Sequence, residues 1–337
     1  MARYLQRARA VLQSLFRGEP APQPVGASTA EPAGENVVVE AGRVTFLDRS
    51  RAASDPAAWL EAFTAATLRN IPVGQDALAI IEQHATRLGV EELLPTDRAR
   101  ERVIEMLRPR PGLSQRLSEM RTCGLLVRLL PEIGGVVHPA ARAALEEAWA
   151  ARALGAIGNL EQLLTEDTLS SKRFGGMLRE LDAPELLVLT VLVPDPGEKR
   201  AEEAARLARA ISDRLQLSGG ALQTIEFLIR NRPQMSQIAF RRDTGDPEVI
   251  KMFAAIFSTE EQLKMLCLMT VADRQTGADA LTPWRGELLW RLFVDTYNQL
   301  TMAYADEVID KSEAALTTLH ANRPSTISDD ELTEFLL

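Results

Sequence analysis

Histidine is scarce in this sequence, with three in 337 residues, and cysteine is scarcer still, with two. Hydrolases that activate water on a transition metal use imidazoles as neutral ligands, and three scattered histidines are too few for a conventional site of that kind. Cys123 and Cys267 each lie in an apolar helical stretch. We therefore predict two buried thiols and no disulfide framework.

Long apolar runs are also missing. The longest, such as residues 186–193, are far shorter than the roughly 20 residues that a membrane-spanning helix needs. The first residues carry spaced arginines rather than the pattern of a secretory signal. A net charge of −9 argues against nonspecific binding to nucleic acid, which relies on lysine and arginine. We expect a cytoplasmic protein with neither a membrane nor a nucleic acid as partner.

The start of the chain divides into three parts. Residues 1–18 have the pattern of a helix, and residues 19–35 have the Pro, Ala, Gly and Glu composition of a flexible linker. Two short β-branched runs then follow, at 37–39 and 43–46, on either side of a turn. They predict a small β-hairpin, and no other part of the chain has a good strand signal.

Signals for helix starts recur from residue 55 onward. A residue that can cap a helix precedes a proline at four places, namely Asp55, His138, Asp246 and Thr282. Two pairs have the spacing of a capping box, Ser258 with Glu261 and Ser328 with Glu331. Between these starts the apolar residues repeat every three or four positions. The chain is therefore predicted to be all-α apart from the hairpin.

A break at Leu130-Pro131 and Gly134-Gly135 predicts a domain boundary. We assign residues 36–135 to the hairpin and a helical arm of about four helices. Residues 136–320 form a second helical block, which ends in one long helix from about 283 to 319, and residues 321–337 are a tail.

Three stretches carry a resemblance to a known family: LSEMRTCGLLVRLLPEIGGVV at 117–137, MSQIAFRRDTGDPEVIKMF at 235–253 and LMTVADRQTGADALTPWRGELLWRLF at 268–293. In order and rough spacing they resemble the helical arm and the HD-type hydrolase domain of bacterial PII uridylyltransferase/uridylyl-removing enzymes. Residues 1–15 resemble the arginine-rich helix that follows the nucleotidyltransferase domain in that family. The resemblance implies an all-α fold in which an HD-like bundle follows the arm.

Two parts of the family architecture have no counterpart in the sequence. No Gly-Ser segment is followed by paired aspartates on a strand, so the nucleotidyltransferase motif is absent. No βαββαβ pattern follows residue 320, so the ACT domains are absent. We expect the chain to be a fragment or a natural remnant of a longer protein.

The resemblance also implies where metal ligands would lie. The first histidine of the family corresponds to Arg152 or a neighbour, and the family's histidine pair corresponds to Asn231-Arg232. The His-Asp pair should end the strand-like run LLVLTVLV, and only its aspartate remains, as Asp195. A later aspartate remains as Asp273. We expect no cofactor and no tightly bound metal, although two carboxylates could hold Mg²⁺ weakly.

Each of these residues also has a structural interpretation. Asp195 is suited to capping a helix or to a solvated loop, and Asp273 to a buried hydrogen bond. Arg241 and Arg242 are suited to salt bridges and caps. The alternative is that five residues bind an anionic ligand in the former metal pocket, namely Arg152, Asn231, Arg232, Arg241 and Arg242.

Three functions follow from these observations. The first is a noncatalytic HD-type module that acts as a regulatory or interaction scaffold, with a PII-like regulator or other domains of the parent chain as partner. The second is the scaffold part of an active nucleotidyltransferase whose catalytic domain lies outside this chain. The third is a domain that senses an anion or a nucleotide.

Overall fold

The computed structural model describes residues 30–134, 142–195, 197–241, 246–273 and 281–321. Within them the chain is helical except for a small sheet near the N-terminus, so the predicted fold class is confirmed. No helix in these ranges is long and apolar enough to cross a membrane. The predicted N-terminal helix, residues 322–337 of the predicted tail, His138 and the Ser328 box lie outside the described residues.

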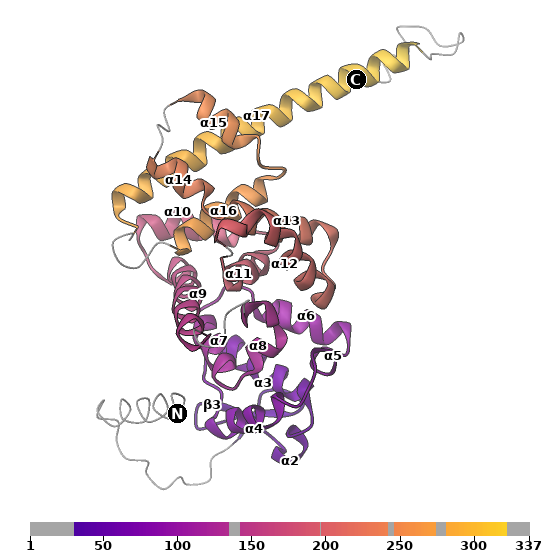
Figure 1. Ribbon diagram of the computed structural model, residues 1–337, viewed down its shortest axis with the longest axis vertical. Helices are drawn as coiled ribbons and strands as arrows, with labels where there is room; N and C mark the ends of the chain where they lie inside the picture. Colours follow the sequence, from indigo (N-terminus) through magenta and orange to yellow (C-terminus); the bar gives the residue numbers. More distant parts are fainter. Residues whose placement is uncertain (1–29, 135–141, 196, 242–245, 274–280, 322–337) are drawn as a thin grey trace.

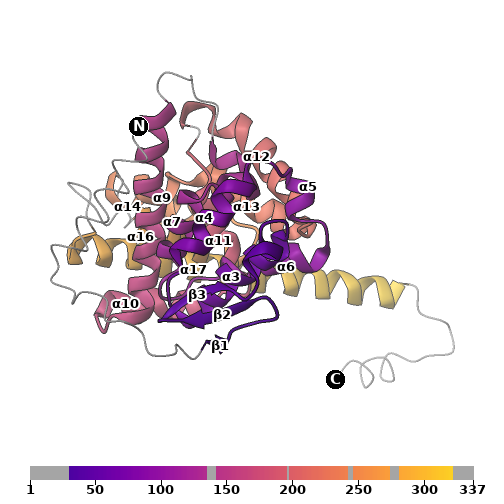
Figure 2. The ribbon, with the colours of Figure 1, turned by 90° about the horizontal axis from the view of Figure 1, so that it is seen from below.

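The predicted hairpin is present, and a third strand extends it. β2 (Val37–Glu40) pairs antiparallel with β3 (Arg43–Phe46), and β1 (Glu31–Pro32) pairs with β2. Two residues of the segment that we assigned to the linker, Glu31 and Pro32, are therefore in the sheet. Figure 2 shows this sheet beside α3 (Pro56–Arg69), against which β2 and β3 pack.

The arm contains more helices than the four that periodicity predicted. Three of its helices have only four or five residues, which is too short for a repeat of 3.6 to be visible in the sequence. Besides α3, the described arm holds α2 (Arg49–Ala52), α4 (Gln75–Ala85), α5 (Val90–Leu93), α6 (Asp97–Met106), α7 (Leu113–Thr122), α8 (Leu125–Leu129) and a 3₁₀ turn at Pro131–Gly134.

In the second block, two buried helices, α11 and α16, are surrounded by the other helices. Both are apolar on nearly all sides, which suits a helix with neighbours all round it. The described helices of this block are α9 (Arg142–Thr165), α10 (Leu169–Arg179), α11 (Pro184–Leu192), α12 (Arg200–Leu215), α13 (Gly219–Asn231), α14 (Gln234–Arg241), α15 (Pro247–Ala254), α16 (Glu260–Asp273) and α17 (Pro283–Ala321). α17 confirms the predicted long helix, and its far end extends away from the rest (Figure 1).

The cap predictions are confirmed at Asp55, Asp246 and Thr282, whose side-chain oxygens accept hydrogen bonds from backbone N–H groups of the first turn. The strand-like run at 186–193 lies in helix α11 and its C-cap, in agreement with the all-α prediction, although a short apolar run has no period that separates a buried helix from a buried strand. One cap prediction was wrong: Thr259, rather than Ser258, accepts the hydrogen bond from Gln262 N at the start of α16.

The arm and the second block share one continuous apolar core, which runs from Val37 to Leu300. α9 connects them, because it packs against α7 of the arm as well as against α10, α11 and α16 (Figure 1). The predicted boundary at 135/136 falls at the edge of an undescribed segment, so the domain division stays a prediction. What the core shows is that the two parts are packed together.

Candidate functional site

Four residues that the resemblance singled out converge in the second block. Arg152 lies on α9, Asp195 follows α11, Arg232 follows α13 and Asp273 ends α16. They come together because α9, α11 and α13 all pack around α16. Two of the four are cations and two are anions, so the site brings charges of both signs to the ends of buried helices.

Arg232 and Asp273 form the centre of this cluster. The Arg232 guanidinium donates from Nε to Asp273 Oδ2 at 2.8 Å and from Nη2 to Oδ1 at 2.7 Å. The arginine side chain is 7% exposed and the aspartate side chain 23%. Such a two-pronged contact is the geometry that arginine makes best with a carboxylate. Asp273 thus makes the hydrogen bond that its structural interpretation predicted, and its partner is the guanidinium group of Arg232.

Arg152 lies beside this pair and is held less tightly. Its Nη1 is 3.5 Å from Asp273 Oδ1, and its Nη2 donates to the Val193 carbonyl at 3.4 Å. Burial and then the positive charge of Arg232 lower the pKa of Arg152, Asp273 and Asp195 oppose the shift, and the resulting pKa is about 10. The side chain is 34% exposed, so Arg152 is the most open cation of the cluster.

Asp195, at the edge of the cluster, makes a local contact, and the remaining predicted site residues have local roles or lie elsewhere. Asp195 is exposed and accepts a hydrogen bond from Gly197 N at 2.9 Å, as in a turn. Asn231 donates its amide to the Phe227 carbonyl of its own helix at 2.9 Å. Arg241 is exposed at the end of α14, and Arg242 lies outside the described residues. Of the five predicted anion-binding residues, the structure brings Arg152 and Arg232 together, and their binding of a ligand stays a prediction.

The cluster does not fit a tightly held transition metal. Both carboxylate oxygens of Asp273 already accept hydrogen bonds from Arg232. The guanidinium groups of Arg152 and Arg232 bring positive charge to the cluster, and positive charge repels a cation. Among the described residues no group of His, Cys, Asp and Glu side chains is arranged to hold a metal ion. Of the histidines in the described ranges, His84 lies in the last turn of α4 in the arm and His320 near the end of α17.

Sequence reasoning missed two residues of α9 that bind the same helix ends. Trp149 Nε1 donates to the Leu192 carbonyl at 2.8 Å, and Asn159 Nδ2 donates to the Ala272 carbonyl at 2.8 Å. Trp149, Arg152 and Asn159 are spaced three and seven residues apart and so share one helix face. That spacing was visible in the sequence, but no local signal indicated which partners the side chains would meet.

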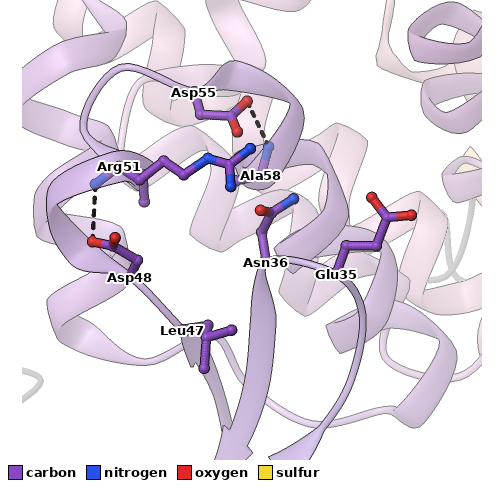
Figure 3. A pocket seen from close by; sticks show the side chains of 8 residues that line it. Glu35, Asn36, Leu47, Asp48, Arg51, Asp55 and Ala58 are labelled. Carbon is purple, nitrogen blue, oxygen red and sulfur yellow. Dashed lines mark hydrogen bonds between the residues drawn. The ribbon is translucent and has the colours of Figure 1, made fainter.

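A separate hollow lies in the arm, between the sheet and the starts of α2 and α3 (Figure 3). Asp48 and Asp55 line it, and each accepts hydrogen bonds from backbone N–H groups of the helix that it caps. Arg51 extends between them in Figure 3. Because both aspartates cap helices, this hollow has the character of a structural junction.

Comparisons with known proteins confirm the resemblance found in the motifs. The chain is 26% identical over 325 residues to the bifunctional uridylyltransferase/uridylyl-removing enzyme of Streptomyces coelicolor, a match that covers 94% of this chain and 36% of the relative. It is 29% identical over 287 residues to the enzyme of the same name from Azotobacter vinelandii, covering 81% of this chain and 31% of the relative. No protein-family model matches the chain. The chain spans about a third of the length of these relatives.

Proposed function

We propose that this chain is a noncatalytic helical part of a uridylyltransferase-like protein, in which the HD-like second block serves as a regulatory or interaction scaffold. The observation that carries the proposal is the Arg232–Asp273 pair at the position where the resemblance places metal ligands. A link to nitrogen regulation through a PII-like partner is part of this proposal and derives from the resemblance.

The chemistry of the pair supports the loss of hydrolysis. A hydrolytic metal must lower the pKa of a bound water, and it needs neutral or negative ligands to stay bound while it does so. To reach Asp273, the metal would have to displace Arg232 and leave a buried cation without its partner. Breaking a buried pair in this way costs about 3–5 kcal/mol, which weakens binding roughly 100-fold or more.

Calorimetric titration of the full chain with Mn²⁺ and with Fe²⁺ tests the proposal. We expect no binding tighter than the millimolar range, and no difference between the natural chain and an Asp273→Asn variant. The same preparations should release no uridylyl group from a uridylylated PII-like protein. Sub-micromolar binding that the substitution abolishes, or turnover above the blank, would overturn the proposal.

A second candidate is the scaffold part of an active uridylyltransferase whose catalytic domain is encoded elsewhere. It is favoured by the names of the relatives and by the chain's coverage of about a third of their length. The reading frame upstream of Met1 distinguishes the two candidates. Paired aspartates on a strand after a Gly-Ser segment, in that frame or in a neighbouring gene, would support this candidate, and a stop codon with no such gene would remove it.

A further inference from the structure

Helix α11 ends inside the protein, where its last carbonyl groups need partners. All its residues except Glu185 are buried, and Val193, which follows it, is buried as well. The final carbonyls of an α-helix have no N–H partner within the helix. Leaving a polar group of this kind unpaired in an apolar surrounding costs free energy. The end of α11 therefore depends on donors from other helices.

These donors are Arg152 and Arg232 of the cluster and Trp149 on α9. Trp149 Nε1 binds the Leu192 carbonyl at 2.8 Å. Arg232 Nη1 donates to the Val193 carbonyl at 3.3 Å, and Arg152 Nη2 donates to the same oxygen at 3.4 Å. The positive guanidinium groups also suit the negative end of the helix dipole. One guanidinium, that of Arg232, thus connects α13 to the ends of both α11 and α16.

We infer that Arg232, assisted by Arg152, is a structural cross-link that fastens the ends of α11 and α16 to α9 and α13 and lets the second block fold without a metal ion. Arginine suits this role because its flat fork of donors binds a carboxylate with two N–H groups while a third reaches a carbonyl, and because it stays charged at all ordinary pH values. The short point charge of a lysine provides no such fork.

This inference deepens the proposed function and rests on it, because it places the Arg232 and Arg152 side chains where the resemblance places a metal ion. The two can fail separately. Tight binding of Mn²⁺ would remove the proposed function, whereas the inference depends on the stability of variants in metal-free buffer.

The test compares thermal unfolding of the full chain and three variants, Arg232→Gln, Arg232→Lys and Arg230→Gln, in buffer with and without EDTA. Arg230 is the matched control, since it lies two residues before Arg232 in the last turn of α13, is half-exposed and pairs with Glu226 one turn away. We expect Arg232→Gln to lower the melting temperature by roughly 5–10 °C, Arg232→Lys to recover less than half of that loss, and Arg230→Gln to stay within about 1 °C. EDTA should leave the natural chain unchanged.

Two results would overturn the inference: melting of Arg232→Gln within about 1 °C of the Arg230→Gln control, or a lower melting temperature of the natural chain in EDTA. If Arg232→Gln cannot be purified in folded form, the milder Arg152→Gln variant serves in its place. Amide hydrogen exchange should then accelerate in α11 and at the end of α16 and remain unchanged in α3 of the arm. Equal exchange in all three helices would contradict the inference.

Discussion

Replacing Glu161 by alanine removes the carboxylate that caps helix α7 from another helix. Glu161 lies on α9, and its Oε2 accepts a hydrogen bond from Gly112 N at 2.8 Å while Oε1 accepts one from Ser114 N at 2.5 Å. α7 has no cap of its own, because its N-cap residue is Gly112, whose backbone has φ 86° and which carries no side chain. The first N–H groups of α7 thus depend on a residue 47 positions or more away in the sequence.

The size of the effect follows from these contacts. A hydrogen bond to a charged group contributes about 1.5–3 kcal/mol when its partner would otherwise be left unpaired, and the negative charge at a helix start adds about 0.3–1 kcal/mol. Since Glu161 is half-buried, we take the lower part of each range and expect Glu161→Ala to reduce the free energy of unfolding by about 2–4 kcal/mol. Glu161→Gln should lose about half as much, because one of its two oxygens remains an acceptor.

Urea unfolding followed by circular dichroism measures this change, with Glu166→Ala as the control. Glu166 is exposed just beyond the end of α9. The substitution Glu166→Ala should therefore change the free energy of unfolding by less than about 0.5 kcal/mol. Amide exchange should also accelerate in α7 of the Glu161→Ala variant. If that variant unfolds within about 0.5 kcal/mol of the control, then α7 does not depend on a cap from α9 and the reasoning is wrong.

The ion pair of Arg214 and Glu132 joins α12 to the end of the arm with both side chains mostly buried. Arg214→Met should therefore cost about 2–3 kcal/mol in urea unfolding, and a double variant with Glu132→Gln should cost less than Arg214→Met alone. Gly112→Ala should destabilise the chain by at least about 1 kcal/mol, because φ 86° strains any residue with a Cβ atom; an unchanged unfolding midpoint would contradict this. Burial raises the pKa of the Cys123 thiol to about 12, and burial raises that of Cys267 as well. Both thiols stay protonated in the folded and unfolded chain below about pH 7.5, so they should leave stability unaffected there. As the pH rises through the unfolded value of about 8.5, stability should fall by up to about 1.4 kcal/mol per pH unit for each thiol; the slope should become smaller when both are replaced by alanine.

The local signals of the sequence predicted much of the fold correctly. Asp55, Asp246 and Thr282 start helices as expected, because a cap and its helix lie within a few residues of each other. The hairpin and the long helix α17 were predicted for the same reason, since β-branched runs and apolar periods are properties of short stretches. The scarcity of histidine is likewise a property of composition alone.

Tertiary structure decided what local signals do not contain. The apolar run 186–192 is helical because it lies in the core, surrounded by other helices. The spacing of its apolar residues alone does not distinguish a buried helix from a buried strand. The partner of Asp273 is Arg232, and the cap of α7 is Glu161, because packing brings together residues 41 and 47 or more positions apart. Which charges meet depends on the whole set of helix contacts, and no stretch of the chain carries that information by itself.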